Sequence, residues 1–127
     1  AQYADLAEKY TADRDYEPGT VVIFGGNEEV TITSKSHDTR VAGVVSTDPA
    51  YLMNAVQGNC AVALTGRVPC YVQGPVNKGT VLVTSPTPGI AMALVSSMYE
   101  PGCVIGKSLA DIQDNSIKMI EVAVGRF

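Results

Sequence analysis

The stretch Asn77-Lys78-Gly79-Thr80-Val81-Leu82-Val83-Thr84 joins a turn to a strand and repeats in outline along the chain. Asn, Lys and Gly suit a tight turn, because glycine reaches positive φ angles without steric cost. Side chains of a strand point to alternate faces, so Val81 and Val83 share one face. A glycine turn followed by a Val-rich run recurs at 18–22 and 101–105. The spacing is irregular, which indicates repeated turn-to-strand units and no solenoid.

The composition favours strands throughout. Seventeen Val, seven Ile and ten Thr stand against six Leu, and β-branched side chains suit a pleated surface better than a helix. Strands are predicted at Thr20–Phe24, Glu29–Thr33, Arg40–Ser46, Cys60–Thr65, Val68–Gln73, Thr80–Thr84, Ile90–Leu94, Cys103–Lys107 and Ile117–Val124. Short strands separated by Gly, Pro and Asn turns predict an all-β fold. We expect a compact barrel or a clip-like arrangement of hairpins, with a small jelly-roll-like sandwich as the alternative.

Helical spacing occurs in only two stretches. Tyr3–Tyr10 has apolar residues at positions 3, 6, 7 and 10, and Pro49–Val56 is of similar length. Each would form roughly two turns, which is too short for a helix to be stable alone.

Two of the predicted strands are apolar on both faces. Thr20–Phe24 and Val41–Val45 therefore need cover on both sides. In a chain of 127 residues, another copy of the chain could supply some of that cover. This is a reason to expect that copies of the chain associate.

The length, composition and charge of the chain limit the kinds of protein it can be and the partners it can bind. The 127 residues suit one domain, and 46% hydrophobic with 17% charged residues is a globular composition. The net charge is −4, and the nine Lys and Arg residues are scattered, which argues against nucleic acid and membrane surfaces as partners. No apolar run is long enough to span a bilayer as a helix.

The three cysteines, Cys60, Cys70 and Cys103, lie in apolar runs. An odd count cannot be fully paired within one chain, and buried reduced thiols are the expectation. Their spacing matches no zinc motif, and the chain has a single His. We expect no metal site and no cofactor.

The lone histidine, His37, lies in the polar stretch Ser34–Arg40. A catalytic interpretation would make His37 a general base oriented by Asp38. Adjacent strand residues point to opposite sides, so a solvated loop is the favoured interpretation. We expect no enzymatic activity.

Other short motifs have a simpler structural explanation. Asp48-Pro49 and Asp114-Asn115-Ser116 could be backbone-cleavage sites, but turns explain both. Glu28-Glu29 is expected to be a solvated hairpin shoulder and not a glycosidase carboxylate pair. Gly25-Gly26 and Gly74-Pro75 lack the residues of a phosphate loop.

Tyrosines are the aromatic side chains most available for binding. Tyr51, Tyr71 and Tyr99 lie nearest to predicted turns and could offer a binding face. We expect each of them to lie at the edge of the core with its hydroxyl group in contact with solvent.

Several longer strings of residues resemble those of a known protein family. They are residues 3–10, 16–22, 39–54, 62–70, 74–79, 101–109 and 120–127, among them Tyr3-Ala4-Asp5-Leu6-Ala7-Glu8-Lys9-Tyr10, Thr39-Arg40-Val41-Ala42-Gly43-Val44-Val45 and Val62-Ala63-Leu64-Thr65-Gly66-Arg67-Val68-Pro69-Cys70. Together they cover nearly the whole chain, and the chain resembles the C-terminal domain of tailed-phage tail-fibre and appendage proteins. It is also distantly similar to appendage chaperone domains that cleave themselves off.

The resemblance implies a virion structural protein, a trimeric cap or attachment domain assembled in the host cytoplasm. Two alternatives stay open: a self-cleaving intramolecular chaperone domain that promotes fibre trimerisation, and a capsid-decorating trimer. Residues 1–11 are expected to lead in from an upstream fibre shaft, and residues 12–127 to form a single all-β C-terminal domain. The implied partners are other copies of the chain, the shaft, and a host cell-surface glycan or protein, whose binding residues the sequence does not identify.

Overall fold

The computed structural model describes residues 3–47, 49–54 and 58–125. These residues form strands and a single 3-10 turn, which confirms the all-β prediction. The elements are β1 (Tyr3–Tyr10), β2 (Val21–Phe24), β3 (Val30–Ile32), β4 (Val41–Val45), β5 (Pro49–Met53), β6 (Cys60–Gln73), β7 (Val81–Thr84), β8 (Ala91–Ala93), η1 (Ser96–Met98), β9 (Val104–Ser108) and β10 (Ile117–Val124).

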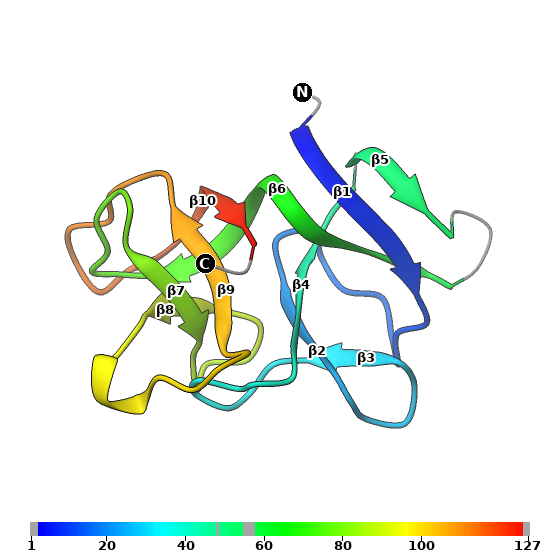
Figure 1. Cartoon of the computed structure of the whole chain (residues 1–127), viewed down its shortest axis with the longest axis horizontal. Coiled ribbons are helices and arrows are strands. Elements are labelled where there is room, and N and C mark those ends of the chain that lie inside the picture. The colour runs from blue at the N-terminus through cyan, green and yellow to red at the C-terminus, as the bar shows by residue number, and fades with distance from the viewer. Residues whose placement is uncertain (1–2, 48, 55–57, 126–127) are drawn as a thin grey trace.

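Five strands close into a barrel. β6 pairs with β10, β10 with β9, β9 with β7, and β7 with β8, all antiparallel, and a parallel contact of β8 with β6 completes the ring. Figure 1 shows this barrel as one lobe of the molecule. The predicted compact barrel is confirmed, and the jelly-roll-like sandwich is not the fold.

The other lobe is a sheet built on the first half of β6 (Figure 1). There β6 pairs with β1 on one edge and with β4 on the other. β2 and β3 extend the sheet beyond β4, and β5 lies parallel to β1.

β6 is one strand where the sequence predicted two. The predicted strands Cys60–Thr65 and Val68–Gln73 are its halves, joined through Gly66 and Arg67. Gly66 has a φ of 105°, which a residue without a Cβ adopts readily. Its partners are Asp5 of β1 and Val124 of β10, so β6 continues from one lobe into the other.

Alternate residues of shared strands fill two separate cores. Val21, Val44 and Ala63 belong to the barrel core, which also contains Leu82, Ile105 and Val122. Their neighbours Val22, Val45 and Val62 belong to a second core with Val30 and Cys60. The apolar faces of β2 and β4 are therefore covered by this chain itself. The argument that another copy could supply some of this cover loses its basis, because it did not foresee a second core inside one chain.

Neither stretch with helical spacing forms a helix in its described residues. Tyr3–Tyr10 forms β1 and Pro49–Met53 forms β5; residues 55 and 56 lie outside the described part of the chain. β1 pairs along Cys60–Gly66, and Ala7 is fully buried there. A short helix is marginal, whereas the edge of β6 offers a ladder of backbone hydrogen bonds. Residues 3–10 are thus part of the sheet, and an upstream shaft stays a prediction.

Candidate binding groove

A groove begins where two strands leave the same edge of β6. Ala63 pairs with Ala7 of β1 on one edge and with Val44 of β4 on the other. Gly66 pairs with β1 on the first edge and with Val124 of β10 on the second. β4 and β10 therefore pair one after the other with the same edge of β6, and they separate from each other beside residues 64 and 65. The sheet forks at this point.

The fork encloses a groove of about 650 Å³, within the size range of small-ligand sites. Val41, Ala42 and Gly43 of β4 form one wall, and Val104, Ile105 and the end of β10 form the other. Leu64 lies at the fork itself, and Tyr10, Phe24, Arg40 and Tyr99 are also in the lining.

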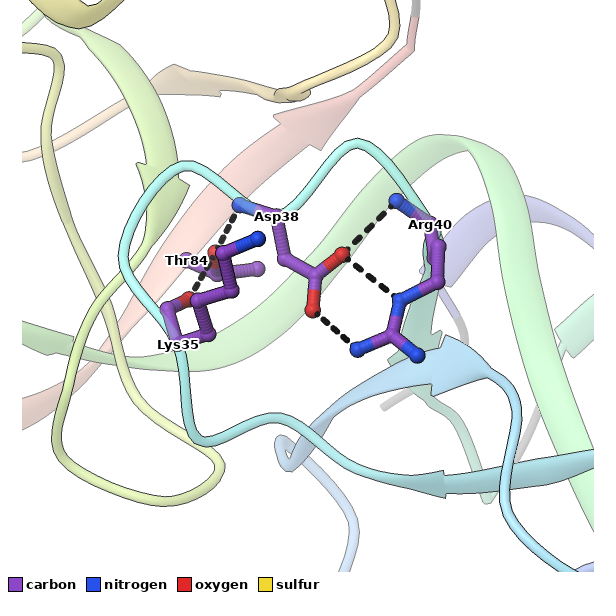
Figure 2. Close-up of polar contacts among 4 residues, drawn as sticks. All are labelled: Lys35, Asp38, Arg40 and Thr84. Carbon is purple, nitrogen blue, oxygen red and sulfur yellow. Dashed lines mark hydrogen bonds and ion pairs between the residues drawn. The ribbon is translucent and has the colours of Figure 1, made fainter.

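Arg40 is held in the groove wall by a buried carboxylate. Its Nε and Nη2 atoms donate to the two oxygens of Asp38 at 3.1 and 2.9 Å, as Figure 2 shows. The Arg40 backbone N–H also donates to Asp38 Oδ1, at 2.9 Å. Asp38 is only 1% exposed. Hydrogen bonds from Arg40 hold the pKa of the Asp38 carboxyl below its usual range, and the same pairing raises the pKa of Arg40.

The loop that carries Asp38 is fastened to the barrel. The Asp38 backbone N–H donates to Thr84 Oγ1 at 2.7 Å, and Thr84 Oγ1 donates to the Lys35 carbonyl at 2.6 Å (Figure 2). The His37 backbone N–H adds a bond to the Thr84 carbonyl, at 3.1 Å. Thr84 is the last residue of β7, so the loop between β3 and β4 is anchored on the barrel lobe. This anchoring also fixes the position of Arg40.

His37 is buried, so the solvated-loop prediction was wrong. It is 5% exposed and has a φ of 54°. Its Nε2 accepts the Val95 backbone N–H at 3.1 Å, and its Nδ1 lies 2.6 Å from Ser36 Oγ. An accepting Nε2 places the proton of a neutral ring on Nδ1, from where it is donated to Ser36. Both ring nitrogens thus make structural contacts, and the Asp38 carboxylate pairs with Arg40.

Of the three tyrosines that were binding candidates, only one lines the groove. Tyr99 lines it and is 51% exposed. Tyr51 lies on β5, and Tyr71 donates its hydroxyl proton to Glu17 Oε1 at 2.5 Å, which raises the pKa of Tyr71. Tyr10 and Phe24 instead supply the other aromatic wall, with ring centroids 5.2 Å apart in an edge-to-face contact.

The remaining sequence candidates lie away from the groove. All three cysteines are buried free thiols, as predicted, and burial raises the pKa of Cys70 to about 12. Asp114 Oδ1 accepts the backbone N–H of Ser116 at 3.0 Å, which confirms a turn there. Glu29 accepts the Thr11 backbone N–H at 2.8 Å. Residue 48, of the Asp-Pro candidate, lies outside the described residues.

The described residues contain neither a metal-binding cluster nor a membrane-spanning helix. No group of three or more His, Cys, Asp or Glu residues there could hold a metal ion. Within the same residues, no helix has the length and apolar character needed to cross a membrane.

Comparisons with protein-family models, with curated proteins and with solved structures found no match for this chain.

Proposed function

We propose that this chain is a virion structural protein, the trimeric C-terminal cap or attachment domain of a phage tail fibre or appendage. The resemblance of its residue strings to such domains is one support. The other is the architecture of the barrel lobe, because a closed barrel has no exposed strand edge and suits a module that must stay intact outside a cell.

An exposed apolar segment supports the proposal that copies of the chain associate. Val95 and Met98 are 45% and 47% exposed. They flank and end η1, none of whose residues is buried. Clustered apolar side chains on a surface mark contact sites more often than isolated ones do. This segment replaces the two-sided strands as the reason to expect association.

Sedimentation velocity of the purified chain at micromolar concentration tests the proposal. We expect a trimer. The double variant Val95→Ser with Met98→Ser should shift the chain towards monomer, because it removes apolar area from the contact. Tyr51→Ser serves as the matched control, since it removes an exposed apolar side chain from β5. A wild-type chain that sediments as a folded monomer at every concentration would contradict the proposal.

A further inference from the structure

We propose that the groove at the fork of β6 binds a neutral saccharide unit. This inference rests on the proposed attachment function and assigns it a site. Four features of the groove carry it: its charge, its aromatic walls, its interrupted strand edge and its rigidity.

The charge of the groove favours a neutral ligand with oxygen acceptors. Arg40 already shares its charge with Asp38 through two side-chain hydrogen bonds. An anion would therefore meet a compensated ion pair, in a chain whose net charge is −4. In the described part of the chain, Arg40 Nη1 makes no hydrogen bond or ion pair. Its N–H groups can donate to a hydroxyl or ring oxygen.

Aromatic rings in the lining suit the apolar face of a sugar ring. Phe24 and Tyr99 are exposed lining residues, and Tyr10 supports Phe24 by its edge-to-face contact. The negative face of an aromatic ring attracts the polarised C–H groups that a pyranose presents on one side. A ligand with hydroxyl groups on its edge and C–H groups on its face matches both Arg40 and the aromatic walls.

The strand edges in the groove are a poor template for an extended peptide. A peptide that adds to a sheet needs a regular ladder of unpaired backbone groups. The groove-facing part of β4 comprises only Val41, Ala42 and Gly43, and the β2–β4 register shifts beside it, between Val22 and Ile23. Such a bulge interrupts the ladder. A compact ligand is therefore favoured over a strand.

Rigidity of the groove lowers the cost of binding. Asp38 is buried and fastened to Thr84, so Arg40 is oriented before a ligand arrives. His37 Nε2 accepts the Val95 N–H and so fixes the start of the segment that carries Tyr99. Groups that are already ordered lose little conformational entropy on binding.

Nuclear magnetic resonance titration of the full chain with methyl glucoside, methyl galactoside and methyl N-acetylglucosaminide, each as a separate probe, tests the site. At least one probe should shift the Arg40 Nε–H and the amides of Gly43 and Gly102 with millimolar affinity. Tyr99→Ala should weaken that binding about tenfold. Arg40→Lys, which keeps a positive charge beside Asp38, should weaken it to a similar degree, whereas Tyr51→Ala should leave it unchanged.

The site is refuted if no probe shifts groove resonances, or if Tyr99→Ala and Arg40→Lys bind as wild type does. Protection of the groove amides that grows with protein concentration, without sugar-induced shifts, would assign the groove to a second copy and also refute it. Sedimentation separates this inference from the proposed function. A trimer without sugar shifts refutes the saccharide site alone, and a monomer with such shifts refutes the trimeric cap alone.

Discussion

Asp38 is a buried carboxylate whose charge is met by a single guanidinium group. Its partner Arg40 is half exposed, so the pair lies at the boundary between the interior and the groove. Such a pair stabilises the fold only while the carboxylate is ionised, because a protonated Asp38 accepts the Arg40 bonds weakly.

Asp38→Asn should lower the free energy of unfolding by about 1–3 kcal/mol at neutral pH. The folded-state pKa of Asp38 is lowered, so its contribution is complete above the unfolded value of about 4 and is lost as pH falls through the folded value. The difference between wild type and variant should therefore shrink below about pH 4. Urea denaturation at a series of pH values measures it, and a difference that stays constant with pH would contradict this account.

At the scale of an element, β4 approaches β6 closely before the two diverge. A Cβ built on Gly43 would lie 2.1 Å from the Ala63 carbonyl oxygen, far inside van der Waals contact. Gly43 is therefore required by the close approach of two backbones at the mouth of the fork.

Gly43→Ala should destabilise the chain by about 2 kcal/mol or more, since β4 must move away from β6. Gly79→Ala is the matched control: Gly79 has a φ of 91°, but an added Cβ there would meet no atom within 4 Å. The control should lose only the cost of backbone strain, about 1–2 kcal/mol. Thermal or urea unfolding compares the two variants, and equal losses would show that contact with Ala63 is unimportant.

At the scale of the whole molecule, the two cores share their strands. β2, β4 and β6 each send alternate side chains to the barrel core and to the second core. Unfolding either core would remove one covered face of these strands, so we expect both cores to unfold in one cooperative transition.

Leu82→Ala in the barrel core should lower the free energy of unfolding by about 2–5 kcal/mol, and Val30→Ala in the second core by about 1.5–3 kcal/mol. Each variant should still unfold in a single step, with circular dichroism and tyrosine fluorescence giving the same midpoint. Tyr51→Ala, at an exposed position, should change the free energy by about 0.5 kcal/mol or less. A variant in which one lobe unfolds before the other would contradict the shared-core account.

Prediction from the sequence succeeded where a signal was local. The Val-rich runs between glycine turns became β2 to β4 and β6 to β10, because alternation and turn chemistry act within a few residues. β1 and β5 were missed, since their residues become strands only when the edge of β6 is present. In the groove, Tyr99 was among the candidates, but Arg40, Phe24 and Leu64 were not. Their shared surroundings depend on strand divergence, which leaves no short-range pattern.

The amino-acid sequence by itself determined that this protein is all-β, with buried thiols and a low charge density, because those properties follow from residue types and their immediate neighbours. The tertiary structure alone decided that β6 passes from one lobe to the other, that a single copy covers both faces of β2 and β4, and that His37 and Asp38 serve different partners. Each of these outcomes depends on contacts between residues far apart in the chain, and the free energy of such contacts is set by packing and not by local preference.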